Sequence, residues 1–165
     1  MCDLAKATSQ NRAAAELDQI IAFLGVIGLS VREQELPENC VLPGISIDAG
    51  VLVVDRKKLL YPGDLLHEAG HMAVIPSAER ALMSIDVGND GGMEMGAIAW
   101  SYAAALAIGL PAEVVFHDAG YKGGAESLRE NFASGRYLGL PILQWRGLTD
   151  ASVKRYPEML KWLAD

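Results

Sequence analysis

The sequence predicts an α+β fold in a single domain, from its length, its apolar content and the order of its periodic segments. A chain of 165 residues with 51% apolar residues can bury a core without disulfide bonds. One helical pattern comes first, short strand patterns follow, and several helical patterns fill the second half. We therefore expect residues 1–165 to form one domain with a small sheet and several helices.

The first expected element is an amphipathic helix from Gln10 to about Leu29. Its apolar residues recur at intervals of three to four positions, which is the helical period. They are Ala13, Leu17, Ile20, Ile21, Leu24 and Ile27. Gly28 follows the last of them and is a typical helix stop.

Two or three strands are expected after this helix. Residues 30–36 alternate in part between polar and apolar side chains, as a half-buried strand does. Within residues 46–55, the sequence Asp-Ala-Gly at 48–50 comes directly before a run of aliphatic residues. We interpret this pattern as a turn that leads into a buried strand.

A second helix is expected to begin near Pro62. Proline is favoured in a first turn, and Asp64 places a carboxylate at the positive end of the helix dipole. This helix runs through His71 and has to end near Pro76, because proline cannot continue it.

The second half of the chain predicts mainly helices. An Ala-rich helix is expected from Met93 to Leu110, between a turn at residues 89–92 and Pro111. Further helical segments are expected at residues 111–117, 124–136 and 157–164.

Composition argues against several classes of protein. A net charge of −7 disfavours a nucleic-acid-binding surface, which normally has a basic patch. The apolar run at residues 98–110 is shorter than the ~20 residues of a membrane span. Residues 1–10 lack a secretion-signal pattern, and Cys2 and Cys40 are too few for a disulfide framework. We therefore expect a cytoplasmic protein without a nucleic-acid or membrane partner.

The second helix carries the motif HExxH, formed by His67, Glu68 and His71. Residues four apart share one helix face, so both imidazoles can bind the same ion, while the glutamate reaches a zinc-bound water. Zinc lowers the pKa of such a water toward ~7, and the carboxylate takes its proton as the water attacks a carbonyl. The pattern therefore predicts a catalytic zinc site with Glu68 as general base.

An alternative is that His67 and His71 are ordinary buried histidines that bond to backbone acceptors, with Glu68 facing solvent. The surrounding residues are mostly apolar, and burying two imidazoles and a carboxylate is costly unless something pairs them. We therefore favour the metal site. Gly70 also indicates a packing or functional constraint, because glycine inside a helix costs about 1 kcal/mol relative to alanine.

A catalytic zinc site needs a third protein ligand. The extended motif HExxHxxGxxH is absent, because Val74 and Ser77 stand where its glycine and third histidine would be. We choose Glu94, which opens the Ala-rich helix and is the only acidic residue between Asp90 and Glu113.

Other roles and other ligands stay open at this point. Glu94 could instead be a first-turn carboxylate that faces the helix dipole. The other candidate ligands are Asp90, Glu79, His117 and Asp118. His117 is the strongest rival, because histidine is a common zinc ligand and the adjacent Asp118 could support it. Tyr102, Tyr121 and His117 are candidates for stabilising an oxyanion. For each of them we favour a structural role instead: a core aromatic for Tyr102, a loop residue for Tyr121 and a surface imidazole for His117.

The motif and its surroundings resemble the small zincin-type metallopeptidases, and most closely the ImmA/IrrE group. That group pairs HExxH with a downstream helix of pattern E-x-x-A-x-x-F-A, and here Glu94, Ala97 and Trp100 follow HEAGH at that spacing. The resemblance covers roughly residues 51–111, with Trp100 and Ser101 in place of the expected phenylalanine and alanine. It implies a zincin-like domain in which a small sheet packs on the HExxH helix.

The resemblance also implies His67, His71 and Glu94 as zinc ligands and Glu68 as general base. We therefore expect a zinc-dependent metallopeptidase that hydrolyses a peptide bond in an unidentified peptide or protein substrate. The alternative function is a zincin-like module that binds metal or another protein without peptidase activity. In that case the acidic, Ala-rich helices would serve association with a partner or in a homo-oligomer.

Overall fold

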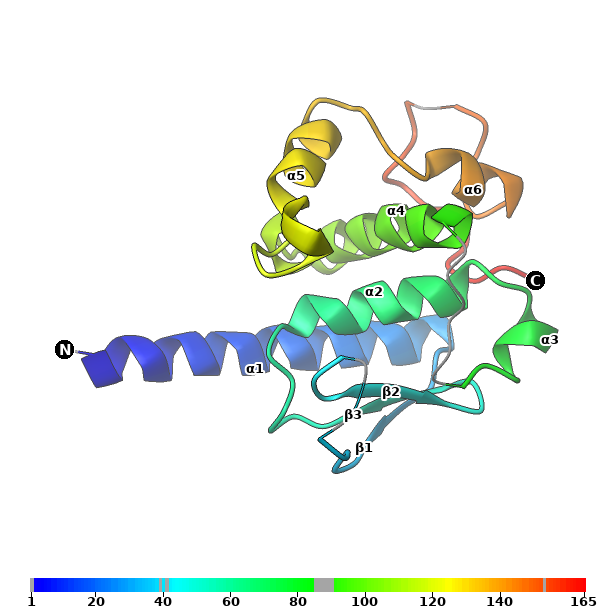
Figure 1. The fold of residues 1–165 in the computed structure, drawn as a ribbon. Coiled ribbons are helices and arrows are strands. Elements are labelled where there is room, and N and C mark those ends of the chain that lie inside the picture. The colour runs from blue at the N-terminus through cyan, green and yellow to red at the C-terminus, as the bar shows by residue number, and fades with distance from the viewer. Residues whose placement is uncertain (1, 39, 41, 85–90, 153) are drawn as a thin grey trace.

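The helix that carries HExxH lies in the middle of a layered structure (Figure 1). The computed structural model describes residues 2–38, 40, 42–84, 91–152 and 154–165, and the side chains of these except residues 2–7. From bottom to top in Figure 1, the layers are a small sheet, the helices α1 and α2, the helix α4, and the helices α5 and α6. The predicted α+β class is confirmed.

Helix α1, Cys2–Ile27, begins earlier than its apolar periodicity indicated and ends where it was predicted to end. Gly28 follows with φ of 94°, a left-handed conformation that glycine adopts without strain. The buried face carries Leu17, Ile20 and Leu24. The N-terminal half of α1 extends beyond the other elements (Figure 1).

The sheet has three short strands in the order β1-β3-β2. Strands β2, Ile45–Asp48, and β3, Val51–Val54, form an antiparallel hairpin, while β1, Val31–Glu33, pairs parallel with β3. Ala49 and Gly50 connect the hairpin with φ of 46° and 77°, as two-residue turns between twisted strands require. The predicted turn and buried strand are therefore confirmed.

Helix α2, Pro62–Ala73, and helix α4, Gly91–Ile108, agree with the two central helix predictions. They pack directly on each other, with a close approach at Gly70. A Cβ at Gly70 would lie 2.8 Å from the backbone oxygen of Ala97 on α4. This close contact is the packing reason that the helical glycine indicated.

The remaining helical segments are short. They are α3 Ser77–Arg80, the 3₁₀ helices η1 Ala112–Val114 and η2 Tyr121–Gly123, α5 Ala125–Ala133 and α6 Leu140–Trp145. The helix expected at 124–136 is α5, and the helix expected at 111–117 is only the short η1. The helices α3 and α6 were not predicted. Of the predicted turn at 89–92, positions 89 and 90 lie outside the described residues, and the two glycines belong to α4.

The expected helix at 157–164 is wrong, because this segment is irregular. Its backbone groups bond to other elements instead of to each other. The amide of Ala164 donates to the oxygen of Ala73 at 2.9 Å, and the indole of Trp100 donates to the oxygen of Trp162 at 2.8 Å. Arg80 also donates to the oxygen of Ala164 at 2.8 Å. These contacts hold the segment against α2 and α4.

None of the described helices is long and apolar enough to span a membrane.

Candidate metal centre

Helix α2 buries almost every side chain around the HExxH motif. Leu65, Leu66, Ala69, Met72 and Ala73 are fully buried in the core. The two histidines lie on the face toward α4, where the side chain of His67 is 15% exposed and that of His71 is 8% exposed. Two imidazoles in such surroundings need polar partners, as the sequence indicated.

The two imidazoles point to one place. The Nε2 atoms of His67 and His71 are 3.2 Å apart, and the two rings are nearly perpendicular. In a tetrahedral zinc site with ligand distances near 2.0–2.1 Å, two ligand atoms are about 3.3–3.4 Å apart. The separation of the nitrogens therefore fits one shared ion.

Glu94 projects from the first turn of α4 toward both histidines. Its Oε1 is 3.3 Å from Nε2 of His67, and its Oε2 is 3.1 Å from Nε2 of His71. Hydrogen bonds from the two imidazoles hold the pKa of the Glu94 carboxyl far below its usual value. The structure thus brings the three predicted ligands together, and the binding of a metal by them stays a prediction.

Glu68 lies beside this group. One carboxylate oxygen of Glu68 and one nitrogen of each histidine all lie within 4.8 Å of one another, and they form the potential metal-binding group found among the described residues. Burial raises the pKa of the Glu68 carboxyl, against the lowering effect of His71 and His67. A carboxylate with a raised pKa accepts protons more readily, as a general base must.

The electrostatics of His67 combine two opposing effects. Burial works to lower the pKa of its imidazole, but the hydrogen bond and charge of Glu94 raise it, and the net pKa lies above the usual value. Without a metal, the His67 imidazole therefore keeps its proton to a higher pH than an ordinary histidine does. A metal ion would replace that proton, since a ligating histidine has to be neutral.

The far side of His67 contacts an aromatic residue from another part of the chain. The hydroxyl of Tyr121 is 3.4 Å from Nδ1 of His67, and the two rings meet edge to face at 5.6 Å. Tyr102, the other tyrosine candidate, packs against Phe116 and Phe132 in an aromatic cluster. No local sequence pattern predicts the pairing of Tyr121 with His67.

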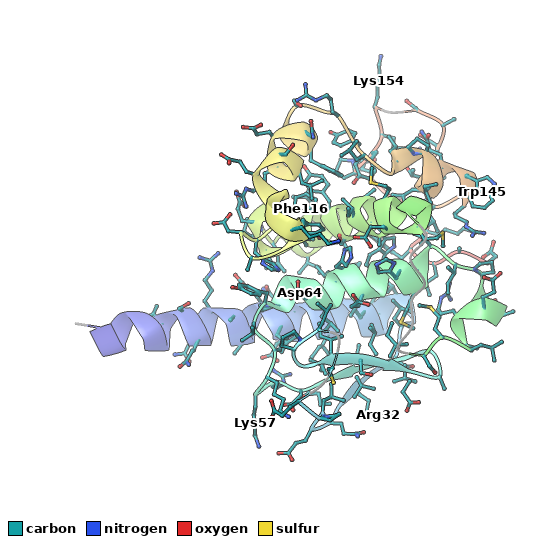
Figure 2. All side chains as sticks on the ribbon, viewed as in Figure 1. Arg32, Lys57, Asp64, Phe116, Trp145 and Lys154 are labelled. Carbon is teal, nitrogen blue, oxygen red and sulfur yellow. The ribbon has the colours of Figure 1, made fainter. Side chains whose placement is uncertain are left out.

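His117, the strongest rival ligand, has a different partner. Its Nε2 is 2.8 Å from Oδ1 of Asp64, and its ring stacks on Tyr61 with the centroids 3.9 Å apart. Asp64 and Phe116, next to His117, lie toward the same end of the α2 and α4 pair (Figure 2). Within the described part of the chain, the potential metal-binding group consists of His67, Glu68 and His71; neither His117 nor Glu94 belongs to it, but Glu94 contacts both histidines whereas His117 contacts Asp64.

The other rival ligands do not join the group either. The side chain of Asp118 is 89% exposed and pairs with Arg129 at 2.9 Å. Glu79 is exposed on α3. Asp90 lies outside the described residues.

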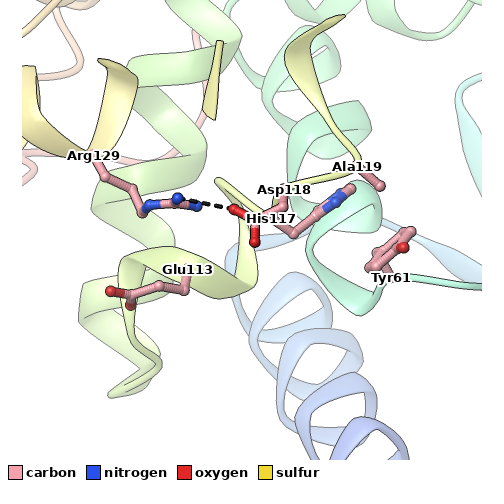
Figure 3. Close-up of a pocket in the computed structure, with 6 residues that line it drawn as sticks. All are labelled: Tyr61, Glu113, His117, Asp118, Ala119 and Arg129. Carbon is pink, nitrogen blue, oxygen red and sulfur yellow. Dashed lines mark hydrogen bonds and ion pairs between the residues drawn. The ribbon is translucent and has the colours of Figure 1, made fainter. Parts of the chain in front are cut away.

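A cavity of about 510 Å³ opens beside His117 (Figure 3). Its lining consists of Tyr61, Glu113, His117, Asp118, Ala119 and Arg129. A second cavity of about 290 Å³ shares Tyr61, Glu113 and His117 with it and continues toward α1. Asp64 lies about one turn before His67 on α2, so its bond to His117 connects the lining of the first cavity to the HExxH helix.

No protein-family model, curated protein or solved structure matches this chain. The family resemblance therefore stays a prediction from the sequence.

Proposed function

We propose that this protein is a zinc-dependent metallopeptidase of the zincin type. The observation that supports this best is the convergence of His67, His71 and Glu94. Two imidazole nitrogens and one carboxylate meet at separations of 3.1 to 3.3 Å, from two helices that pack tightly. Two histidines and a glutamate are one of the usual ligand sets of catalytic zinc, which keeps its fourth position open.

When bound, zinc would polarise the substrate carbonyl and make an attacking water more acidic. The protein itself supplies the proton transfer. Glu68 takes a proton from the attacking water and then delivers it to the nitrogen of the departing amine. Its closeness to the two histidines and its burial suit this role.

The helices give this site both rigidity and access. His67 and Glu68 belong to a helix whose other faces are buried in the core, so their positions are fixed by packing. The side chain of Glu94 is 46% exposed, so the group opens to solvent on the α4 side. We expect a substrate to approach from that side.

The test uses a matched pair of glutamate variants in the full chain. Glu68→Gln should retain about one zinc per chain and lose peptide hydrolysis by at least about 100-fold, the scale of a lost general base. Glu79→Gln makes the same chemical change on exposed α3 and should retain both properties. Zinc content is measured by elemental analysis, and hydrolysis by mass spectrometry of new termini in a peptide library.

Two results would contradict the proposal. A chain that holds no zinc after exposure to excess zinc would exclude the metal site. A chain that holds zinc, forms a stable complex or oligomer and leaves every peptide intact would favour the alternative, an interaction module without peptidase activity.

A further inference from the structure

The imidazole of His67 has two nitrogen atoms in different surroundings. Its Nε2 faces His71 and Glu94, whereas its Nδ1 is 3.4 Å from the hydroxyl of Tyr121. If Nε2 binds a metal, it needs its lone pair, so the proton of the neutral ring has to lie on Nδ1. That N–H group then needs an acceptor, and the phenol oxygen of Tyr121 is placed to be one.

Tyr121 reaches this position through an unusual backbone. Tyr121 and Lys122 have φ of 55° and 52°, and Gly123 follows with φ of 86°. Left-handed conformations cost roughly 1–2 kcal/mol for a residue with a side chain. They persist where surrounding contacts fix them, and they are concentrated at functional sites. Here the turn directs a tyrosine ring toward the HExxH helix.

Two ring contacts hold the phenol in place. The Tyr121 ring meets His67 at 90° with the centroids 5.6 Å apart, and it meets Phe116 at 78° and 5.6 Å. Edge-to-face contacts of this kind are favourable and directional. The hydroxyl of Tyr121 can accept one hydrogen bond while it donates another.

We propose that Tyr121 is a positioning residue of the metal centre, which accepts a hydrogen bond from Nδ1–H of His67 and so keeps Nε2 available to the ion. This inference rests on the proposed zinc site. It also gives Tyr121 a role different from oxyanion stabilisation, since its hydroxyl contacts the side of His67 that faces away from Glu94.

The two histidines differ in this respect. Nδ1 of His71 is buried and has no hydrogen-bond partner among the described residues. The effect of removing the Tyr121 hydroxyl should therefore appear at His67 and leave the tautomer of His71 unchanged.

The test compares Tyr121→Phe with Tyr102→Phe in the full chain. Both changes remove one hydroxyl from a ring that contacts Phe116, but only Tyr121 contacts His67. Zinc affinity is measured by calorimetric titration. Tyr121→Phe should bind zinc about 10-fold to 100-fold more weakly, the usual effect of losing such an outer hydrogen bond, and Tyr102→Phe should bind as the unmodified chain does.

Nitrogen NMR of the imidazoles gives a readout that a purely structural role would not change. The chain has three histidines, so their ¹⁵N resonances can be assigned with few variants. The zinc-loaded unmodified chain should show His67 protonated at Nδ1, and Tyr121→Phe should shift this resonance while that of His71 stays in place.

Unchanged zinc affinity and an unchanged His67 resonance in Tyr121→Phe would overturn the role of Tyr121 and leave the zinc site standing. Absence of zinc binding by the unmodified chain would instead overturn the proposed function and this inference with it. If Tyr121→Phe fails to fold, the unmodified chain still decides the question, because a His67 protonated at Nε2 in the presence of zinc contradicts the proposal.

Discussion

Replacing Gly70 by alanine tests whether the tight contact between α2 and α4 builds the site. The added Cβ would lie 2.8 Å from the backbone oxygen of Ala97 and 3.0 Å from its Cα. These are backbone atoms of a packed helix, so they cannot rotate away. Gly25 in α1 is the matched control, because a Cβ there would meet nothing within 4 Å.

The two variants should change stability in different directions. Alanine in place of a helical glycine stabilises by up to about 1 kcal/mol, which applies in full to Gly25→Ala. At Gly70 the helices have to separate by about 0.5 Å to restore normal contact, and overpacking of this kind costs about 1–3 kcal/mol. Gly70→Ala should therefore lower the free energy of unfolding by about 0–2 kcal/mol. The free energies of unfolding of the two variants should then differ by about 1–3 kcal/mol.

The same displacement should weaken the site. Glu94 lies one turn before Ala97 on α4, so a shift of α4 carries its carboxylate away from both imidazoles. Urea denaturation measures stability, and calorimetric titration measures zinc affinity. If Gly70→Ala were stabilised as much as Gly25→Ala and bound zinc equally tightly, the helix contact would not position Glu94 as described.

Three further changes test other parts of the structure. Arg80→Ala should destabilise the fold by about 2 kcal/mol, because the guanidinium donates to the backbone oxygens of Met72, Ile75 and Ala164. An exposed ion pair is worth only ~0.5 kcal/mol, and Arg12→Ala, which removes such a pair, is the control. In denaturant titration, a loss for Arg80→Ala no larger than that for Arg12→Ala would contradict this. His117→Ala should leave zinc affinity unchanged, because His117 bonds to Asp64; a large loss of affinity would make His117 the third ligand. The backbone amides of Leu36 and Lys57 donate to the buried Asp55 carboxylate and hold the pKa of this carboxyl below its usual value. The ionised carboxylate therefore stabilises the fold above about pH 4, and this stabilisation is lost as the pH falls further. The destabilisation caused by Asp55→Asn should accordingly be smaller at pH 3 than at pH 7, and an equal loss at both values would count against the assignment.

Local signals made the central elements predictable from the sequence. Proline at the start of α2, the glycine turn of the hairpin and the apolar runs of α4 each act within a few residues, so the sequence carries them directly. The segment at 157–164 was mispredicted for the opposite reason. Its conformation depends on bonds to α2, α4 and Arg80, which are distant in sequence.

The candidate site likewise has residues that a local pattern predicts and a contact that it does not. His67, Glu68 and His71 lie within one turn of a helix, so their spacing alone indicated a shared site. Glu94 was predicted from its position in an apolar helix, and the structure places it opposite both histidines. The contact of Tyr121 with His67 joins residues 54 apart through a left-handed turn, and no local pattern encodes it.

The proposed ligand set can be observed in a crystal structure of the zinc-loaded chain with anomalous diffraction at the zinc edge. We expect one strong anomalous peak, bound by Nε2 of His67, Nε2 of His71 and a carboxylate oxygen of Glu94. Absence of a peak between these three side chains, or a peak at the two histidines completed by His117 in place of Glu94, would refute this metal centre.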